Sequence, residues 1–236
     1  MPGNFYGRLF PARSLHFVHS SCSLHLFCEI SHSAITVPRI PLNKGNIYLA
    51  KTSPPGVHKA YLNQFEKDFT AFLRSRSEEM IPGGCTVLTI HGRDENNDSS
   101  VKHSPTIWDF FGMMCMQGLI EESKLDSFNI PFYGALAEEV RDVIQAEGSF
   151  TIKRLESFHV SWDASIDDRY RDTTDKYTKS MFVAKRIRAV MEAILARNFG
   201  DEIVDVMFQR FSIKIGETME TVSGGYNNHV VSMAKA

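Results

Sequence analysis

Several features that mark common classes of protein are missing from this 236-residue chain. It contains no Gly-rich loop of the kind that cradles a phosphate or a dinucleotide. No apolar run approaches the ~20 residues that span a bilayer, and the N-terminus lacks the charged-then-apolar order of a signal peptide. The formal net charge is -2, so the chain has no bulk electrostatic attraction to nucleic acid or to an anionic membrane.

Cysteine is also scarce, and its four positions show no disulfide-framework spacing: Cys22, Cys28, Cys85 and Cys115. A reducing, cytoplasmic location is therefore expected. The chain does have the composition of a globular protein, because 43% of its residues are hydrophobic and 23% are charged. At this length, one or two domains with a sizeable core are expected.

Hydrophobic periodicity predicts strands and helices in alternation. Strands are expected at residues 15–19, 85–90, 150–162 and 229–233. Helices are expected at residues 55–76, 107–119, 138–147, 181–199 and 202–211. Residues 26–42 fit a loop, and residues 81–84 fit a tight turn with two glycines. This order indicates an α/β fold with a mainly parallel sheet and helices on its faces.

Histidine and cysteine recur at every third residue near the first strand, at His16, His19, Cys22, His25 and Cys28. Zinc prefers such ligands, but residues three apart in a strand point to opposite faces. No second ligand pair follows at a typical return spacing, so a strand followed by a loop is the better interpretation. Cys22 and His25 could also form a nucleophile and its base, although no oxyanion loop or orienting carboxylate accompanies them.

Two further clusters have both a structural and a functional interpretation. Trp108 lies among Phe and Met residues, which favours a place in the core but would also suit a pocket for a flat aromatic substrate. The segment Asp126–Pro131 offers a carboxylate, an amide and backbone carbonyls, which are hard oxygen ligands that suit Mg²⁺. Taken alone, this segment fits an Asx-type turn.

Six short segments resemble, in order, the segments of one family. They are Gly3–Phe10, Leu15–Leu24, Asn43–Tyr48, Leu125–Pro131, Glu147–Phe150 and Val183–Val190. In these segments the chain resembles the plant SABATH carboxyl methyltransferases, which methylate salicylate, benzoate, jasmonate, indole-acetate or gibberellins and include the xanthine N-methyltransferases. The resemblance runs nearly end to end, and it begins after the family's S-adenosylmethionine-binding first half-sheet.

This resemblance implies a partial Rossmann-like methyltransferase sheet with a helical cap, made mainly of residues 94–148 and 163–200. It also implies methyl transfer from S-adenosylmethionine to a small aromatic or aliphatic carboxylic acid. A carboxylate is already a competent nucleophile at neutral pH, so no catalytic base is expected and positioning and desolvation would carry the rate.

The resemblance assigns site residues as well. Asn4 and Phe5 stand where the family places a Ser-Phe pair against the adenine of the cofactor. The substrate positions fall on Cys22, His25, Leu26, Ile107, Trp108 and Ile187. Leu26 replaces a Trp whose indole N–H usually holds the substrate carboxylate, and because Leu offers no donor, altered recognition of the acid is expected. The Mg²⁺ ligands fall on Asn43, Asp126, the Phe128 carbonyl and Asn129.

We therefore expect a carboxylic-acid methyltransferase that is weak or inactive as an isolated chain, since the Gly-rich turn and the acidic ribose ligand are both missing. The alternative is a non-catalytic fragment that pairs, as a homo- or heterodimer, with a full-length family member. A metal-dependent hydrolase is a more distant alternative. Neither nucleic acid nor a membrane is an expected partner.

Overall fold

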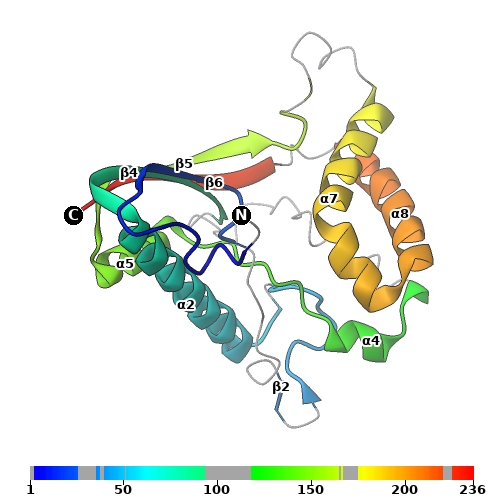
Figure 1. Ribbon diagram of the computed structural model, residues 1–236. Coiled ribbons are helices and arrows are strands. Elements are labelled where there is room, and N and C mark those ends of the chain that lie inside the picture. The colour runs from blue at the N-terminus through cyan, green and yellow to red at the C-terminus, as the bar shows by residue number, and fades with distance from the viewer. Residues whose placement is uncertain are drawn as a thin grey trace.

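The computed structural model describes residues 3–25, 36–37, 40–50, 52–93, 118–164, 166, 175–219 and 225–236. Four strands form one sheet in the order β1–β4–β6–β5 (Figure 1). These strands are β1 (Leu15–Ser21), β4 (Met80–Gly92), β5 (Phe150–Ser161) and β6 (Gly225–Lys235). A separate two-stranded pair, β2 (Thr36–Val37) and β3 (Ile40–Pro41), lies inside the segment that was expected to be a loop.

The sheet was expected to be mainly parallel, and this expectation is wrong, because two of the three strand pairs in the described sheet are antiparallel. β1 runs parallel to β4, but β6 is antiparallel to both β4 and β5. The cause lies in the connection between the last two strands. In the described residues, α7 (Lys176–Phe199) and α8 (Asp201–Met219) form a helical hairpin between the two strands, and β6 begins beside the end of β5, with Gly225 opposite Ser161 (Figure 1). The last strand must therefore run backwards between its neighbours.

The tight turn expected at residues 81–84 lies inside β4 rather than before it. The register places Leu15 opposite Met80 but Phe17 opposite Cys85, so β4 carries extra residues at this point. Gly83 has a φ of +75°, which a residue with a side chain adopts only with strain. The turn residues therefore form a bulge at the start of a long strand.

The long helix α2 (Pro55–Glu79) covers one face of the sheet. Its first residue is a proline, whose missing N–H would have had no partner in the helix. The aromatic residues predicted to lie at 3.6-residue spacing are buried: Tyr61, Phe65, Phe69 and Phe72. Their shared face explains why the periodicity was visible in the sequence.

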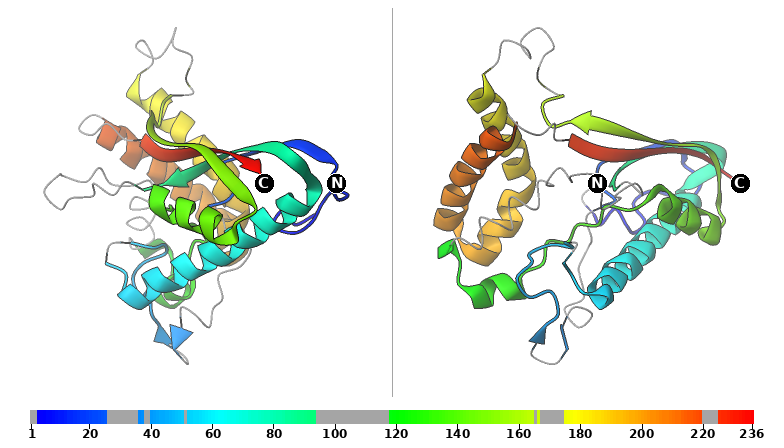
Figure 2. Two further views of the ribbon diagram at one scale, coloured as in Figure 1. Left: turned by 90° about the vertical axis from the view of Figure 1, so that its left-hand side faces the viewer. Right: turned by 180° about the vertical axis from the view of Figure 1, so that it is seen from behind.

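A shorter helix, α5 (Ala137–Glu147), packs beside α2 on the same face (Figures 1 and 2). It ends at Gly148, whose φ of +83° stops the helix in the left-handed conformation. The apolar side chains between these helices and the sheet form a continuous cluster, here called the sheet core. Its central members are Phe65, Phe69, Leu73, Leu88, Val143, Ile144 and Val231.

A second cluster, here called the helical core, lies between α7, α8 and the segment around α4 (Glu122–Ser127). Its central members are Phe128, Trp162, Val183, Met191, Leu195, Phe208 and Phe211. Asp175 caps α7 by accepting hydrogen bonds from the N–H groups of Tyr177 and Thr178, at 2.9 and 3.1 Å. No helix among the described residues is long and apolar enough to cross a membrane.

Ile130 connects the two cores. Its N–H donates to the carbonyl of Ile47 at 2.6 Å, and its carbonyl accepts from the Tyr61 hydroxyl on α2 at 3.1 Å. The Ile130 side chain belongs to the helical core, whereas Tyr61 belongs to the sheet core. The segment through Ile130 therefore ties the helical pair to the sheet.

Candidate active site

The strands β1 and β4 end side by side. Ser21 lies opposite Thr89 in the parallel register, and the N–H of Cys22 donates to the Thr89 carbonyl at 2.8 Å. Cys22 has a φ of +51°, an uncommon value for a residue with a side chain, and the chain leaves the sheet there toward His25. Ligands of open α/β sheets bind outside the carboxyl ends of the strands, so this edge is where a site is expected.

Two imidazole rings meet at this edge. His25 follows the end of β1, His91 lies near the end of β4, and their ring centroids are 4.6 Å apart. Burial and the neighbouring His91 lower the pKa of His25 to about 3. Burial also lowers the pKa of His91; the neighbouring Asn228 opposes this shift, and the Arg186 charge adds a smaller lowering. Both rings are therefore neutral at physiological pH.

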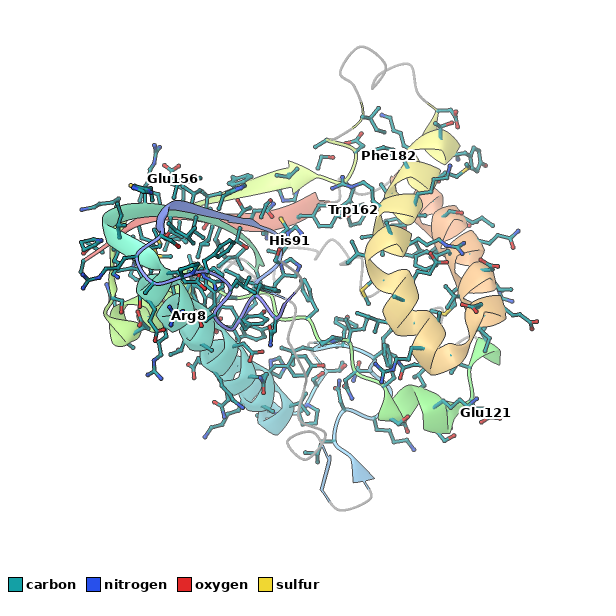
Figure 3. The ribbon with its side chains drawn as sticks, viewed as in Figure 1. Arg8, His91, Glu121, Glu156, Trp162 and Phe182 are labelled. Atoms are coloured by element: carbon teal, nitrogen blue, oxygen red, sulfur yellow. The ribbon has the colours of Figure 1, made fainter. Side chains whose placement is uncertain are left out.

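Aromatic rings flank the two imidazoles. Phe132 lies edge-on to His25 with a centroid distance of 5.1 Å, and Tyr226, near the start of β6, lies 5.4 Å from His91. His91 sits at the end of the sheet that faces α7 (Figure 3). The four rings come from three strand ends and one connecting segment, so they form one aromatic group at the candidate site.

Tyr133 anchors the backbone of His25. Its N–H donates to the His25 carbonyl at 2.9 Å, and its hydroxyl donates to Glu139 Oε1, also at 2.9 Å. Arg93 donates to the same Glu139 oxygen at 2.6 Å and lies over the Tyr133 ring. Hydrogen bonds that converge on one carboxylate hold this corner of the site in a fixed geometry.

The end of β4 is held against β6 by a close packing of Gly92 on His229. The Nε2 atom of His229 lies 2.9 Å from the Ala135 carbonyl, and its Nδ1 lies 2.7 Å from the Ser157 hydroxyl. A Cβ atom at Gly92 would come within 2.0 Å of the His229 Nε2. Only glycine fits here, because the imidazole occupies the space where any side chain would stand.

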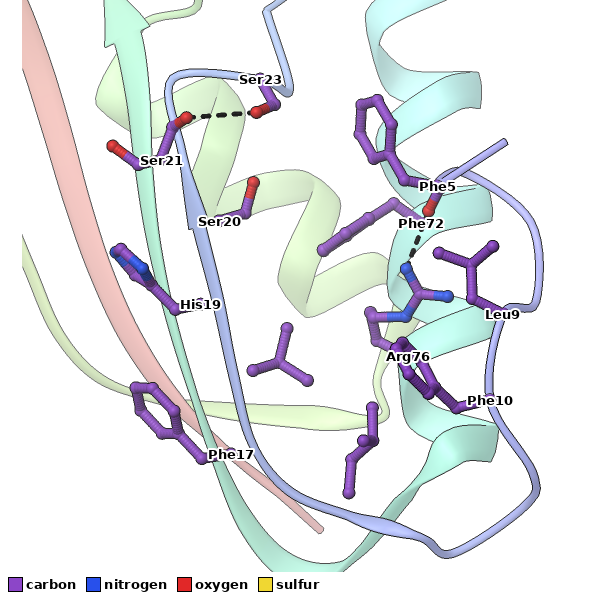
Figure 4. A pocket seen from close by; sticks show the side chains of 12 residues that line it. Phe5, Leu9, Phe10, Phe17, His19, Ser20, Ser21, Ser23, Phe72 and Arg76 are labelled. Atoms are coloured by element: carbon purple, nitrogen blue, oxygen red, sulfur yellow. Dashed lines mark hydrogen bonds between the residues drawn. The ribbon is translucent and has the colours of Figure 1, made fainter. Parts of the chain in front are cut away.

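Phe5, one of the two residues predicted to bind the cofactor, lines a hollow of about 400 Å³ beside β1 (Figure 4). Phe5 lines it and stacks on Tyr6 with a centroid distance of 4.3 Å. The Asn4 side chain accepts a hydrogen bond from the Tyr6 N–H at 3.1 Å, which fixes the turn that carries the Phe5 ring. Ser21 and Ser23 line the same hollow from the end of β1.

Arg76 on α2 fixes the other end of this turn. Its guanidinium donates to the carbonyls of Phe5 and Gly7, both at 2.8 Å, and to the carboxylate of Glu79. Burial would raise the pKa of Glu79, but the hydrogen bonds from Arg76 and from the N–H groups of Phe10 and Leu9 lower it below its usual value. The turn is thus attached to α2 through a buried ion pair.

The structure describes three of the six predicted substrate residues. His25 is buried beside the strand ends, and Cys22 is half-buried next to it. Ile187 lies on α7 in the helical core and is 9% exposed. The neighbouring Arg186 is close enough to influence the pKa of His91, so this part of α7 faces the site. Leu26, Ile107 and Trp108 lie outside the described residues, and a single pocket for all six stays a prediction.

The two segments predicted to hold Mg²⁺ lie side by side. Asn43 Nδ2 donates to Asn129 Oδ1 at 2.8 Å, and the N–H of Gly45 donates to Asp126 Oδ1 at 2.9 Å. Phe128 lies between them in sequence, with its ring in the helical core. The two segments meet, as the resemblance implied, and their side chains offer hard oxygens of the kind that Mg²⁺ prefers; a metal site formed by all four oxygens stays a prediction.

These oxygens already have partners in the protein. Ser53 donates to Asn43 Oδ1 at 2.6 Å, and the Lys44 ammonium lies 3.9 Å from Asp126 Oδ2 and 3.3 Å from Glu122. Among the described residues there is no group of three His, Cys, Asp or Glu that could hold a metal ion. The oxygen donors are of the kind that suits Mg²⁺, and Mg²⁺ at this position stays a prediction; the Lys44 ammonium would compete with the ion for Asp126.

Residues 1–236 match the family described as "SAM dependent carboxyl methyltransferase". The chain belongs to this family, the SABATH methyltransferases.

Proteins that are similar in sequence to this chain have names that state different substrates. The chain is 42% identical to "Probable jasmonic acid carboxyl methyltransferase 2" of Theobroma cacao, a match that covers 99% of this chain and 64% of that protein. It is 43% identical to "3,7-dimethylxanthine N-methyltransferase TCS1" of Camellia sinensis, over 90% of this chain and 57% of that protein. The chain thus spans less than two thirds of the length of these relatives.

The fold is shared with a solved methyltransferase. The structure titled "Loganic acid methyltransferase with SAH" superposes with a TM-score of 0.79 at 27% identity, covering 99% of this chain and 65% of that chain. The α/β Rossmann-like methyltransferase fold expected from the sequence is therefore confirmed, with the mixed strand pairing described above. S-adenosylmethionine is the cofactor of the family.

Sequence reasoning missed His91, Phe132 and Tyr226. The signal for His91 was available, because the strand predicted at residues 85–90 stops one residue short of it. A polar residue at the carboxyl end of a parallel strand is a candidate site residue. Phe132 and Tyr226 carried no such signal, since their place at the site depends on how β6 and the connecting segment return to the sheet.

Proposed function

We propose that this chain forms the acceptor-binding part of an S-adenosylmethionine-dependent methyltransferase that acts on small carboxylic acids of the salicylate, benzoate or jasmonate type. The sulfonium of the cofactor, when bound, supplies the methyl group for an in-line displacement. The residues of this chain orient the acceptor and exclude water, while the ionised acceptor acts as its own nucleophile.

One observation carries this proposal: two neighbouring parallel strands end together between the Phe5 hollow and the buried aromatic group around His25. The hollow is lined by Ser21 and Ser23, and His25 follows two residues later along the chain. A methyl donor on one side of the β1 end and an acceptor on the other would meet at this turn. Cys22, which has a left-handed backbone conformation, is the residue at which the chain passes from the hollow to the aromatic group.

We also propose that the isolated chain binds S-adenosylmethionine weakly. Phe5 offers one stacking face, but the sequence has no Gly-rich turn and none of the described residues at the hollow is an acidic ribose ligand. The alternative function, a non-catalytic module that pairs with a full-length relative, is supported by the open outer side of β1. In the described sheet β1 has a neighbour on one side only, and Phe17 on this strand is 57% exposed.

Titration calorimetry with S-adenosylmethionine, followed by a radiolabelled methyl-transfer assay on benzoate, salicylate and jasmonate, tests the proposal. We expect no micromolar dissociation constant for the chain alone. We expect both binding and transfer when the N-terminal third of a full-length relative is joined to Pro2. The variant Phe5→Ala in the joined protein should weaken cofactor binding, whereas His58→Gln on the exposed side of α2 should not. Transfer that stays absent from the joined protein would contradict the methyltransferase proposal.

Mg²⁺ at Asn43, Asp126, the Phe128 carbonyl and Asn129 remains part of the proposal. Removal of Lys44 by Lys44→Gln should raise the affinity for Mg²⁺, because the ammonium no longer competes for Asp126. Asp126→Asn should abolish that binding. If calorimetry detects no Mg²⁺ binding to either the natural chain or Lys44→Gln, these oxygens serve only to join the two segments.

A further inference from the structure

The aromatic group at the strand ends packs against the helical core. Tyr226 contacts this core, and its ring lies 5.4 Å from that of His91. Phe132 contacts the core as well, and its ring lies 5.1 Å from that of His25. The same core contains Ile187 on α7. This helix and the aromatic group therefore belong to one packed unit, and α7 side chains next to Ile187 are candidates to touch a ligand held there.

Arg186 brings a guanidinium to this side of α7. Its Cζ atom lies 5.9 Å from the centre of the Phe182 ring, and Phe182 lies on the side of α7 toward the sheet (Figure 3). Burial raises the pKa of the Tyr226 hydroxyl, and the Arg186 charge opposes that shift. Burial lowers the pKa of His91, and the same charge lowers it further. A charge that acts on rings from two strands lies near both of them.

The group next to this guanidinium is largely apolar and uncharged. The imidazoles of His25 and His91 are neutral at physiological pH, and Arg93 at the neighbouring corner already bonds Glu139. The His25 Nδ1 is buried and makes no hydrogen bond within the described part of the chain. Buried polar atoms are nearly always paired, so this nitrogen indicates that a polar ligand or water belongs beside it.

A carboxylate is costly to place among aromatic rings unless a cation and hydrogen-bond donors compensate its charge. The planar guanidinium of arginine is suited to this task, because its N–H groups match the two oxygens of a carboxylate. Arg186 is exposed in the structure. An acid seated on the aromatic group would remove water from the guanidinium, and its attraction to the carboxylate would become stronger.

We propose that Arg186 is a specificity-determining residue whose guanidinium binds the carboxylate of the methyl acceptor, while the apolar part of the acceptor lies against the aromatic group. This inference rests on the proposed function and deepens it, since it names the group that selects an acid over a neutral molecule of the same shape. Carboxylate oxygens have several lone pairs, so an oxygen bound to Arg186 still has one to direct at the methyl group. The ester product has lost its charge and therefore loses this contact.

A matched pair of probes tests the inference. Benzoate and benzamide have the same ring and nearly the same shape, but only benzoate is charged at neutral pH. Dissociation constants of both for the chain are measured by ligand-observed NMR titration at one fixed ionic strength. We expect benzoate to bind about tenfold or more tightly than benzamide, because a charge-assisted interaction with a guanidinium separates the two probes.

Three variants assign the preference to Arg186. Arg186→Met removes the charge and should reduce the tenfold preference to about twofold or less, mainly by weakening benzoate. Arg186→Lys keeps the charge without the planar fork and should retain part of the preference. Lys185→Met is the matched control, since Lys185 is the adjacent exposed cation but lines a separate hollow between α7 and α8. It should leave the preference unchanged.

The outcomes separate this inference from the proposed function. A preference that survives Arg186→Met, or that Lys185→Met removes equally, overturns the role of Arg186, and so does a loss that Arg186→Lys does not partly restore. Equal binding of the two probes to the natural chain, or no binding of benzoate, also overturns it. A preference that disappears in Arg186→Met alone of the three variants supports the recognition role. If the joined protein then transfers no methyl group, only the enzymatic proposal is contradicted.

Discussion

The sheet side and the helical side of the molecule stabilise charged groups in opposite ways. On the sheet side, Arg76 and Glu79 form a buried ion pair whose side chains are 5% and 0% exposed. On the helical side, Arg188 bonds Glu192 and Asp205 on the surface. A buried pair depends on every hydrogen bond around it, whereas a surface pair exchanges readily with water. The sheet side should therefore be the more sensitive of the two to single polar substitutions.

The largest expected effect is that of Arg76→Leu. This change leaves Glu79 buried without its cation and releases the turn that carries Phe5, so we expect a loss of ~3–5 kcal/mol in the free energy of unfolding. Arg188→Leu is the matched control on the helical side and should change stability little. Urea unfolding monitored by circular dichroism measures both. Equal losses for the two variants would remove the distinction between the sides.

The same pair predicts an acid limit for the sheet side. The folded state holds the pKa of Glu79 below its ordinary value of 4.5, so its carboxylate stabilises the fold at neutral pH. This contribution is lost as the pH falls below about 4.5, through the lowered pKa of the folded state. In Arg76→Leu this loss of stability on acidification should be smaller, since the hydrogen bond and charge of Arg76 no longer lower the pKa of Glu79 while those of the Phe10 and Leu9 N–H groups remain.

A smaller, pH-dependent effect is expected from His25. Its pKa in the folded state is about 3, against 6.5 when free, so between these values the unfolded chain binds a proton that the folded chain does not. Stability should therefore fall as the pH is lowered from 7 to 5, by about 2 kcal/mol from this residue. The variant His25→Gln should show a shallower dependence when urea unfolding is repeated across this range. If His25→Gln leaves the pH dependence of the unfolding free energy unchanged, the His25 imidazole of the natural chain is solvated or hydrogen-bonded.

Substitutions at the two edge strands of the described sheet should change stability least, but one of them should change self-association measurably. Phe17 on β1 and Phe158 on β5 are both exposed, at 57% and 44%. β5 carries Lys153, Arg154 and Glu156, which protect an edge, whereas β1 has no Lys, Arg, Asp or Glu. Phe17→Lys should reduce self-association in sedimentation velocity and leave the unfolding free energy within ~0.5 kcal/mol. Phe158→Lys should change neither, and an equal response of both edges would contradict this difference.

Most of the sheet side could be predicted from the sequence because its signals are local. The α2 aromatics recur at helical spacing, and Gly148 ends α5 as expected. On the helical side, Gly200 likewise ends α7 as expected. The antiparallel entry of β6 could not be predicted from strand and helix order alone, since it depends on α7 and α8 forming a hairpin. The same holds for the site. His25 was assigned to the site through resemblance, but its contact with His91 joins residues from separate strands, and no local sequence pattern predicts such a contact.

The packing of Gly92 on His229 has a consequence for how this protein can change through mutation. A side chain at residue 92 is excluded while the imidazole stands 2.0 Å from the position of its Cβ, and that imidazole also holds Ala135 beside the site. A replacement at residue 92 therefore requires a smaller residue at 229, together with a small shift of the Ala135 carbonyl, which the new Cβ would approach to 2.8 Å. The two positions form an epistatic pair in which the order of substitutions matters, although they lie 137 positions apart along the chain, from 92 to 229.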